Sequence, residues 1–187
     1  MADGLARASG LRQGAPLPVD TLVIHIRSGD VFGERPHPSL GQPPLSFYEK
    51  VLVHSRPQNV LLVYEDDLNP VIPKLQAHLE SLSITYSVHS GGLRSDLQLL
   101  LSARQLVTGK GTFGQALLVL SPHIERWYAF GEGKERFPTS RRRSVVSITD
   151  RDGGYAAPLG CWENSPNQRD LMLKYSASNL VLTERSS

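Results

Sequence analysis

A histidine and an arginine stand two positions apart in the segment His25-Ile26-Arg27-Ser28-Gly29-Asp30. The preceding residues 21–24, Thr-Leu-Val-Ile, form a β-branched apolar run that is typical of a buried strand. The carboxyl end of such a strand opens onto the ligand crevice of an α/β sheet, and side chains two residues apart in extended chain point the same way. The pair therefore predicts an anion site, with a phosphorylated substrate as its natural ligand.

A second candidate is the glycine-rich segment 109–114, Gly-Lys-Gly-Thr-Phe-Gly, which follows a short apolar run at 106–108. Its glycines let backbone approach a ligand, its Thr112 hydroxyl can donate, and the amino end of the helix expected after it favours anions. The segment matches neither the P-loop nor the GxGxxG dinucleotide pattern. A phosphate cradle and a plain turn with a helix cap therefore both remain open.

Three acidic residues, Glu65-Asp66-Asp67, end a second apolar run at 60–64. Carboxylates there suit a metal ion or a sugar hydroxyl, but Asp66 or Asp67 is also well placed to cap a helix over 70–81. We favour the helix cap and place no metal at this point.

The elements that must position these residues alternate along the chain. Helical spacing of apolar residues at 47–52, at 70–81 and from Ser95 or Asp96 onward separates strands at 21–26, 60–64, 84–89 and 106–108. The polar alternation in 84–89 indicates an edge strand. Right-handed crossovers in this order predict an α/β fold with a doubly wound, Rossmann-like parallel sheet. The loops after Ile26, at Asp96 and at 109–114 should then meet at one edge.

Composition fits one ordinary globular domain, with 187 residues of which 40% are hydrophobic and 20% charged. The net charge of +2 does not call for a nucleic-acid partner, and no apolar run approaches the roughly 18 residues of a membrane span. We expect a soluble chain. Cys161 is the only cysteine, which excludes an intramolecular disulfide, and we expect it to be buried or half-buried.

The two ends of the chain differ from its middle. Residues 1–18 are rich in Gly and Pro and are expected to be a leader or linker, 19–130 the ligand-binding domain, and 131–187 a loop-rich C-terminal extension. Residues 124–130 should form an aromatic helix or strand, 145–148 a short strand, and 150–170 a loop. The run Arg141-Arg142-Arg143 suits an anionic surface or a modification site, although a solvated charge run is the interpretation we favour.

Taken together, residues 20–122 resemble the donor-binding half of the fucosyltransferase superfamily that carries an HxRxGD motif, which includes α1,2-, α1,6- and protein-O-fucosyltransferases. The resemblance is carried by His25 to Asp30, Phe47-Tyr48-Glu49-Lys50, Val63-Tyr64-Glu65-Asp66-Asp67, and Ser95-Asp96-Leu97 through Thr112-Phe113-Gly114. It implies the second domain of a GT-B fold, which binds GDP-fucose without a metal ion or other cofactor.

The resemblance also assigns roles to single residues. Arg27 would contact the β-phosphate and stabilise the GDP leaving group, which makes it catalytic as well as binding, and a guanidinium fork suits that task. His25 would lie near the nucleotide, and the Asp96 carboxylate would accept hydrogen bonds from guanine. Taken alone, His25 would be interpreted as an ordinary core or turn histidine, but its pairing with Arg27 favours the anion site. Without the resemblance, Asp96 would be interpreted as a first-turn acid at the amino end of a helix.

The remaining motif residues would support this site. Thr112 and Phe113 would approach the phosphates, and Gly29 and Asp30 would shape the turn. Lys110 departs from the family pattern, so a phosphate contact and a solvent position stay open for it, as they do for Arg94.

Only about 20 residues precede the strand that carries the motif, where this family has a complete acceptor-side domain. We therefore expect a fragment, or a protein that has lost that half. One hypothesis is a glycosyltransferase donor domain that serves transfer of fucose to a glycan or protein hydroxyl, and the other is a noncatalytic nucleotide-phosphate or glycan-binding module or remnant derived from one. An unrelated phosphate-binding α/β domain is a third. For a longer eukaryotic enzyme the resemblance implies the Golgi or ER lumen.

Overall fold

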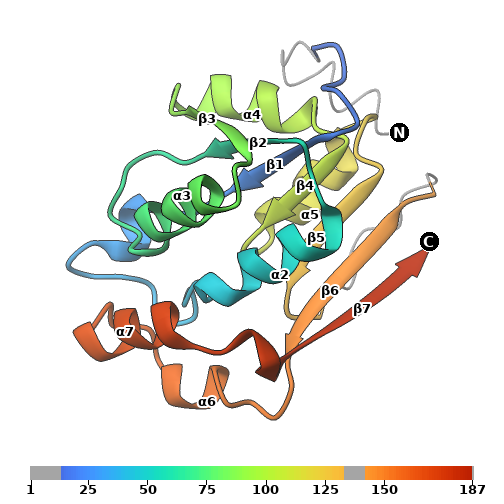
Figure 1. Cartoon of the computed structure of the whole chain (residues 1–187). Coiled ribbons are helices and arrows are strands. Elements are labelled where there is room, and N and C mark those ends of the chain that lie inside the picture. The colour runs from blue at the N-terminus through green and yellow to red at the C-terminus, as the bar shows by residue number, and fades with distance from the viewer. Residues whose placement is uncertain (1–13, 133–141, 187) are drawn as a thin grey trace.

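The strands of this protein form a single, mostly parallel sheet (Figure 1). The structure is a computed structural model that describes residues 14–132 and 142–186. Within these residues the strand order is β3-β2-β1-β4-β5-β6-β7, and only β7 runs antiparallel to its neighbour. The strands are β1 (Thr21–His25), β2 (Asn59–Val63), β3 (Thr85–His89), β4 (Gln105–Thr108), β5 (Arg126–Phe130), β6 (Ser144–Asp150) and β7 (Leu180–Ser186).

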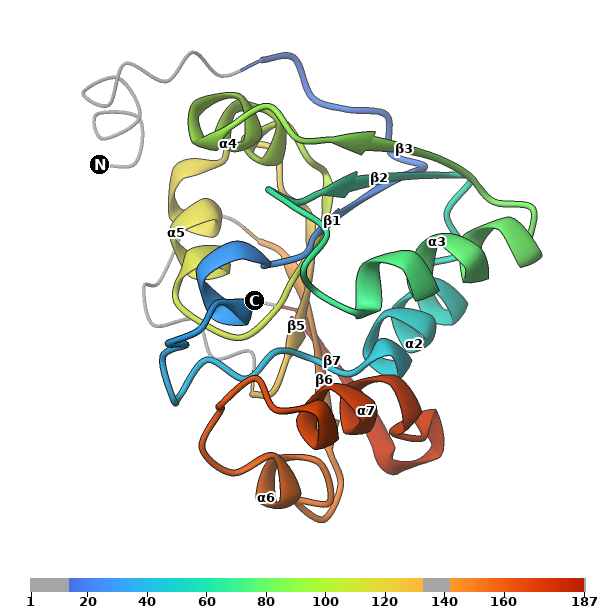
Figure 2. The same ribbon diagram turned by 90° about the vertical axis from the view of Figure 1, so that its left-hand side faces the viewer.

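Helices cover both faces of the sheet (Figure 2). The helices α2, α3 and α7 pack on one face, where Phe47 and Leu75 meet Ile24 in one apolar cluster. The helices α4 and α5 pack on the other, where Leu100 and Leu117 meet Val23 and the neighbouring strands. The helices are α2 (Leu45–Ser55), α3 (Val71–Ser81), α4 (Leu93–Leu101), α5 (Phe113–Leu120), α6 (Ala156–Leu159) and α7 (Pro166–Lys174), and the 3-10 helices are η1 (Gly29–Phe32) and η2 (Ala177–Asn179).

The chain reverses its direction of travel across the sheet between β1 and β4. From β1 it moves outward through α2, β2 and α3 to β3, and α4 then carries it back to β4 on the far side of β1. This is the doubly wound, Rossmann-like order, and the predicted α/β fold class is confirmed. The reversal opens a crevice at the carboxyl ends of β1 and β4, where open α/β sheets bind their ligands.

Most of the predicted elements are present with small shifts at their ends. The segment predicted as an edge strand is β3, which is indeed the outer strand of the sheet. The aromatic residues near 127 form strand β5 and not a helix. Helix α4 begins at Leu93, before the expected Ser95 or Asp96, because Gly92 occupies the position that precedes its first turn.

The segment after residue 141 belongs to the same sheet as the rest of the chain. The expected loop at 150–170 in fact contains α6 and the start of α7, and β7 follows as a further strand paired along its length with β6. Trp162 is buried and its Nε1 donates to the Val31 carbonyl oxygen at 2.6 Å, while Asn164 Nδ2 donates to that of Phe32. The C-terminal segment therefore holds the 3-10 helix that follows β1.

Two predictions about single side chains were wrong. Cys161 is exposed and not buried or half-buried. In the arginine run, Arg143 is buried, and its guanidinium donates to the carbonyl oxygens of Leu118 and Ser121 at the end of α5. The last carbonyl groups of a helix lack partners within the helix, and a cationic side chain is a favourable donor to them. Arg142 is exposed, and Arg141 lies outside the described residues.

The N-terminal boundary falls in a segment that is only partly described. Residues 1–13 of the expected leader lie outside the described residues. Leu17 packs against the cluster under α4 and α5, and its backbone N–H donates to the Ser102 carbonyl oxygen at 2.8 Å. Across residues 14–132 and 142–186, no helix has the length and apolar character that a bilayer crossing requires.

Candidate functional site

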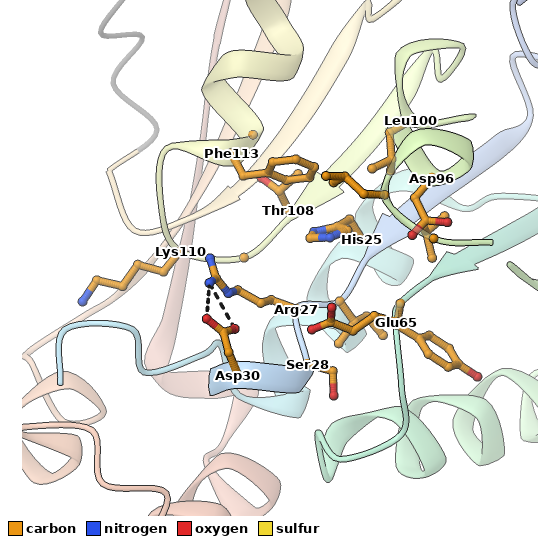
Figure 3. A pocket seen from close by; sticks show the side chains of 17 residues that line it. His25, Arg27, Ser28, Asp30, Glu65, Asp96, Leu100, Thr108, Lys110 and Phe113 are labelled. Atoms are coloured by element: carbon orange, nitrogen blue, oxygen red, sulfur yellow. Dashed lines mark hydrogen bonds and ion pairs between the residues drawn. The ribbon is translucent and has the colours of Figure 1, made fainter. Parts of the chain in front are cut away.

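A cavity of about 400 Å³ lies at the crevice between the carboxyl ends of β1 and β4 (Figure 3). The strand ends are level with one another, because His25 is paired with Val63 of β2 on one side and with Thr108 of β4 on the other. The three loops predicted to meet do so here, and the loop after β2 joins them. The polar lining residues are His25, Arg27, Ser28, Asp30, Tyr64, Glu65, Asp96, Thr108 and Lys110.

Arg27 lies at the tip of β1 and lines the cavity in an exposed ion pair. Its Nη2 lies 3.2 and 3.1 Å from the two carboxylate oxygens of Asp30, three residues on. The Arg27 side chain is 35% exposed and that of Asp30 is 72% exposed. Exposed pairs of this kind contribute at most about 1 kcal/mol, so a ligand phosphate can replace Asp30 as the partner of the guanidinium. Asp30 is thus a direct neighbour of the cation as well as part of the turn.

His25 is the aromatic floor of the cavity. Its ring packs against that of Phe113 with centroids 4.7 Å apart. Burial lowers the pKa of His25 from 6.5 to about 4, the positive charge of Arg27 acts in the same direction, and Asp96 partly opposes both. The imidazole is therefore neutral at pH 7, so Arg27 supplies the positive charge of the predicted pair and His25 supplies a polar ring.

Asp96 lies in the first turn of α4 with its carboxylate at the cavity wall and 15% of the side chain exposed. Oδ1 accepts a hydrogen bond from the Gly91 backbone N–H at 3.0 Å and lies 3.3 Å from Nε2 of His89. Both contacts use the same oxygen and hold the Gly91-Gly92 turn against the helix. The carboxylate is thus structurally fixed while it faces the cavity.

The glycine-rich segment supplies a helix amino end to the same space. Gly114 is buried in the first turn of α5, where an added Cβ would lie 2.3 Å from Thr108 Oγ1, so only glycine lets the helix start this close to β4. Phe113 and Lys110 line the cavity, whereas Thr112 is exposed and lies outside its lining. The amino ends of α4 and α5 both adjoin the cavity, an arrangement that favours a bound anion.

The loops after β1 and β2 are joined by a partly buried hydrogen-bond network. Asp66 Oδ1 accepts from the Ser28 hydroxyl and the backbone N–H groups of Gly29 and Leu68. Asn69 donates through Nδ2 to the Arg27 carbonyl oxygen at 2.9 Å. The prediction that Asp66 or Asp67 caps α3 was wrong, because Pro70 precedes that helix and it has no side-chain cap. Asp66 instead fixes the backbone on which Arg27 stands.

Glu65 also lines the cavity, although the sequence analysis weighed it only as one of three carboxylates suited to a metal ion or a sugar hydroxyl and then favoured a helix cap at this point. Its carboxylate faces the cavity between Arg27 and Asp96 (Figure 3). Its position two residues beyond β2 was a usable signal, because carboxyl ends of parallel strands carry ligand-binding residues.

Within residues 14–132 and 142–186, no three His, Cys, Asp or Glu side chains gather in a way that would hold a metal ion. No protein-family model matches this sequence, and the comparisons with curated proteins and with solved structures found no match. The site is therefore interpreted from its own chemistry. One guanidinium, a lysine and two helix amino ends suit a phosphate group, and the neighbouring carboxylates suit hydroxyl or N–H donors.

Proposed function

We propose that this chain is a nucleotide-sugar-binding domain, and that its ligand is GDP-fucose used as the donor in a fucosyltransferase-like reaction. The observation that carries the proposal is the convergence of Arg27 with the amino ends of α4 and α5 on one cavity at the reversal point of the sheet. The cavity volume of about 400 Å³ lies within the ordinary range of ligand pockets.

In this proposal the diphosphate replaces Asp30 at the Arg27 guanidinium and extends toward the amino end of α5. The guanine lies toward α4, where the Asp96 carboxylate accepts hydrogen bonds from its N–H groups. Because Oδ1 already binds Gly91, we assign Oδ2 to the guanine. A carboxylate matches the donor edge of guanine and finds no such pair of donors on uracil, so this contact favours GDP over UDP.

The chemistry that follows is a displacement at the anomeric carbon of fucose. The acceptor hydroxyl oxygen forms the new bond to this carbon and gives up its proton to a base or to water. The bond from the carbon to the β-phosphate oxygen breaks, and GDP leaves with the electron pair. Negative charge grows on the departing phosphate, and Arg27 stabilises it there with a charge-assisted hydrogen bond. The same contact binds the donor, so Arg27 serves binding and leaving-group stabilisation together.

The test is calorimetric titration of the chain with GDP-fucose, GDP and UDP. Arg27→Ala should weaken GDP binding by about 1.5 to 3 kcal/mol, or roughly 10- to 150-fold, because a charge-assisted hydrogen bond is lost. Asp96→Ala should narrow the preference for GDP over UDP. Arg185→Ala is the matched control, since it removes the same charge from β7 at the opposite edge of the sheet. Equal, weak responses to all three nucleotides would refute the proposal.

A further inference from the structure

The carboxylate of Glu65 occupies a distinctive place in the cavity. It comes from the loop after β2 and faces the cavity between Arg27, which we assign to the phosphates, and Asp96, which we assign to the base (Figure 3). Among the described residues, no hydrogen bond or ion pair engages its side-chain oxygens, although its backbone carbonyl oxygen accepts from Ser90. The residue is exposed, so these side-chain oxygens are open both to water and to the donors of a ligand in the cavity.

The position of this carboxylate is defined by close packing on Gly29. A Cβ at Gly29 would lie 1.8 Å from Glu65 Oε1, so the carboxylate rests on the bare backbone of the turn that follows Arg27. Gly29 has a φ of +60°, a conformation that glycine adopts without strain. The Asp66 hydrogen bonds to Ser28 and Gly29 lock the same two loops together. The fold thereby holds the loop that carries Glu65 against the turn that follows Arg27.

Three carboxylates and one cation act on the charge of Glu65. Burial raises the pKa of Glu65, the carboxylates of Asp66 and Asp30 raise it further, Arg27 lowers it, and Asp96 adds a smaller upward effect. No metal-ligand group forms among the described residues. Hydroxyl groups of a sugar satisfy a carboxylate in these surroundings and add no charge to a cavity whose cation is already assigned to phosphate.

We infer that Glu65 accepts hydrogen bonds from the 2′- and 3′-hydroxyls of the ribose of the bound nucleotide. The inference rests on the proposed function and deepens it. The ribose is the group that joins base to diphosphate, and Glu65 lies between the residues assigned to those two groups. Glu65 thus selects ribonucleotides over deoxyribonucleotides.

The experiment compares GDP, 2′-deoxy-GDP and 2′,3′-dideoxy-GDP in calorimetric titrations of the intact chain. The unmodified protein should bind GDP about 10-fold more tightly than dideoxy-GDP, since two hydrogen bonds are lost. Glu65→Ala should bind all three alike, and Glu65→Gln, which keeps the size of the side chain, should discriminate less than the unmodified protein. Asp67→Ala is the matched control, because it removes an exposed carboxylate two residues along and should keep the full preference.

The inference is overturned if Glu65→Ala retains the preference for GDP over dideoxy-GDP, or if the unmodified protein binds the three alike. It is also overturned if Glu65→Ala weakens GDP-fucose binding alone, which would assign the carboxylate to the transferred sugar. In each of these results GDP still binds and the proposed function stands. Failure of the unmodified protein to bind GDP at all overturns both. Thermal unfolding of each variant separates loss of the fold from loss of the contact.

Discussion

Acidification should destabilise this protein through His25, which is buried in the neutral form at the cavity floor. Burial, helped by Arg27, lowers the pKa of His25 from 6.5 to about 4 in the folded protein. A histidine whose folded pKa lies below its unfolded value contributes stability above the unfolded pKa, and this contribution is lost as the pH falls through the folded pKa. The sensitive window is therefore pH 6.5 to 4.

The size of the effect follows from the two pKa values. Because the pKa of His25 falls from 6.5 to about 4 on folding, the folded state binds the proton more weakly than the unfolded state does. Relative to neutral pH, the unfolding free energy is therefore lower by about 2 kcal/mol at pH 5 and by about 3 kcal/mol at pH 4. This is a large part of the roughly 5 to 15 kcal/mol that stabilises an ordinary domain.

The assay is urea unfolding followed by circular dichroism at pH 7.5, 6, 5 and 4, with His25→Phe as the comparison. Phenylalanine cannot titrate, and its ring can keep the contact with Phe113. Hydrogen-bonded carboxylates such as Asp66 and Asp150, whose pKa values are lowered, destabilise both proteins equally on acidification and cancel in the difference. The reasoning is refuted if the two unfolding curves move in parallel, or if the imidazole of His25 titrates near 6.5 by NMR.

Two further substitutions test the turn that carries Arg27. Gly29→Ala should lower the unfolding free energy by about 1 to 2 kcal/mol and weaken GDP binding, because Gly29 has a φ of +60° and an added Cβ would meet Glu65. Gly33 has a φ of −73°, so Gly33→Ala should leave the unfolding free energy and GDP binding unchanged. Asp66→Ala should cost about 1 to 3 kcal/mol in urea unfolding, since it removes the acceptor of three hydrogen bonds. Asp67→Ala, which removes an exposed carboxylate, should stay within about 0.5 kcal/mol. Equal effects within either pair would contradict the geometry.

The alternation of strands and helices was predictable because it follows from local pattern, and the polar alternation of β3 predicted its place at the edge of the sheet. Continuous apolar runs marked β1, β2 and β4, and the helical spacing between them left a parallel sheet with right-handed crossovers as the stable arrangement. A parallel sheet places the carboxyl ends of its strands at one edge, so the loops after Ile26, at Asp96 and at 109–114 were expected to meet there. These inferences need only the periodicity of nearby residues.

The C-terminal part was harder to interpret, because its structure depends on distant partners. Only the first three residues of β7 are apolar and its last four are exposed, so its apolar run is too short to mark a strand, and its pairing with β6 holds it in place. Trp162 donates a hydrogen bond from Nε1 to the carbonyl oxygen of Val31, which follows Asp30 and lies 131 residues away in sequence. A Gly- and Pro-rich stretch that looked like loop therefore supports the site.

The sequence alone determined which residues stand at the ends of the strands, because a strand's end is marked by the change from apolar to polar residues beside it. It placed His25, Arg27 and Asp96 at the ligand edge on that basis. The tertiary structure decided which of them share a cavity, that Arg27 faces Asp30, that Asp66 is bound into the loop network, and that Glu65 faces the ligand space. The Asp66 bonds and the place of Glu65 depend on the register between loops about 40 residues apart, and the shared cavity joins loops farther apart still, so only the folded sheet fixes them.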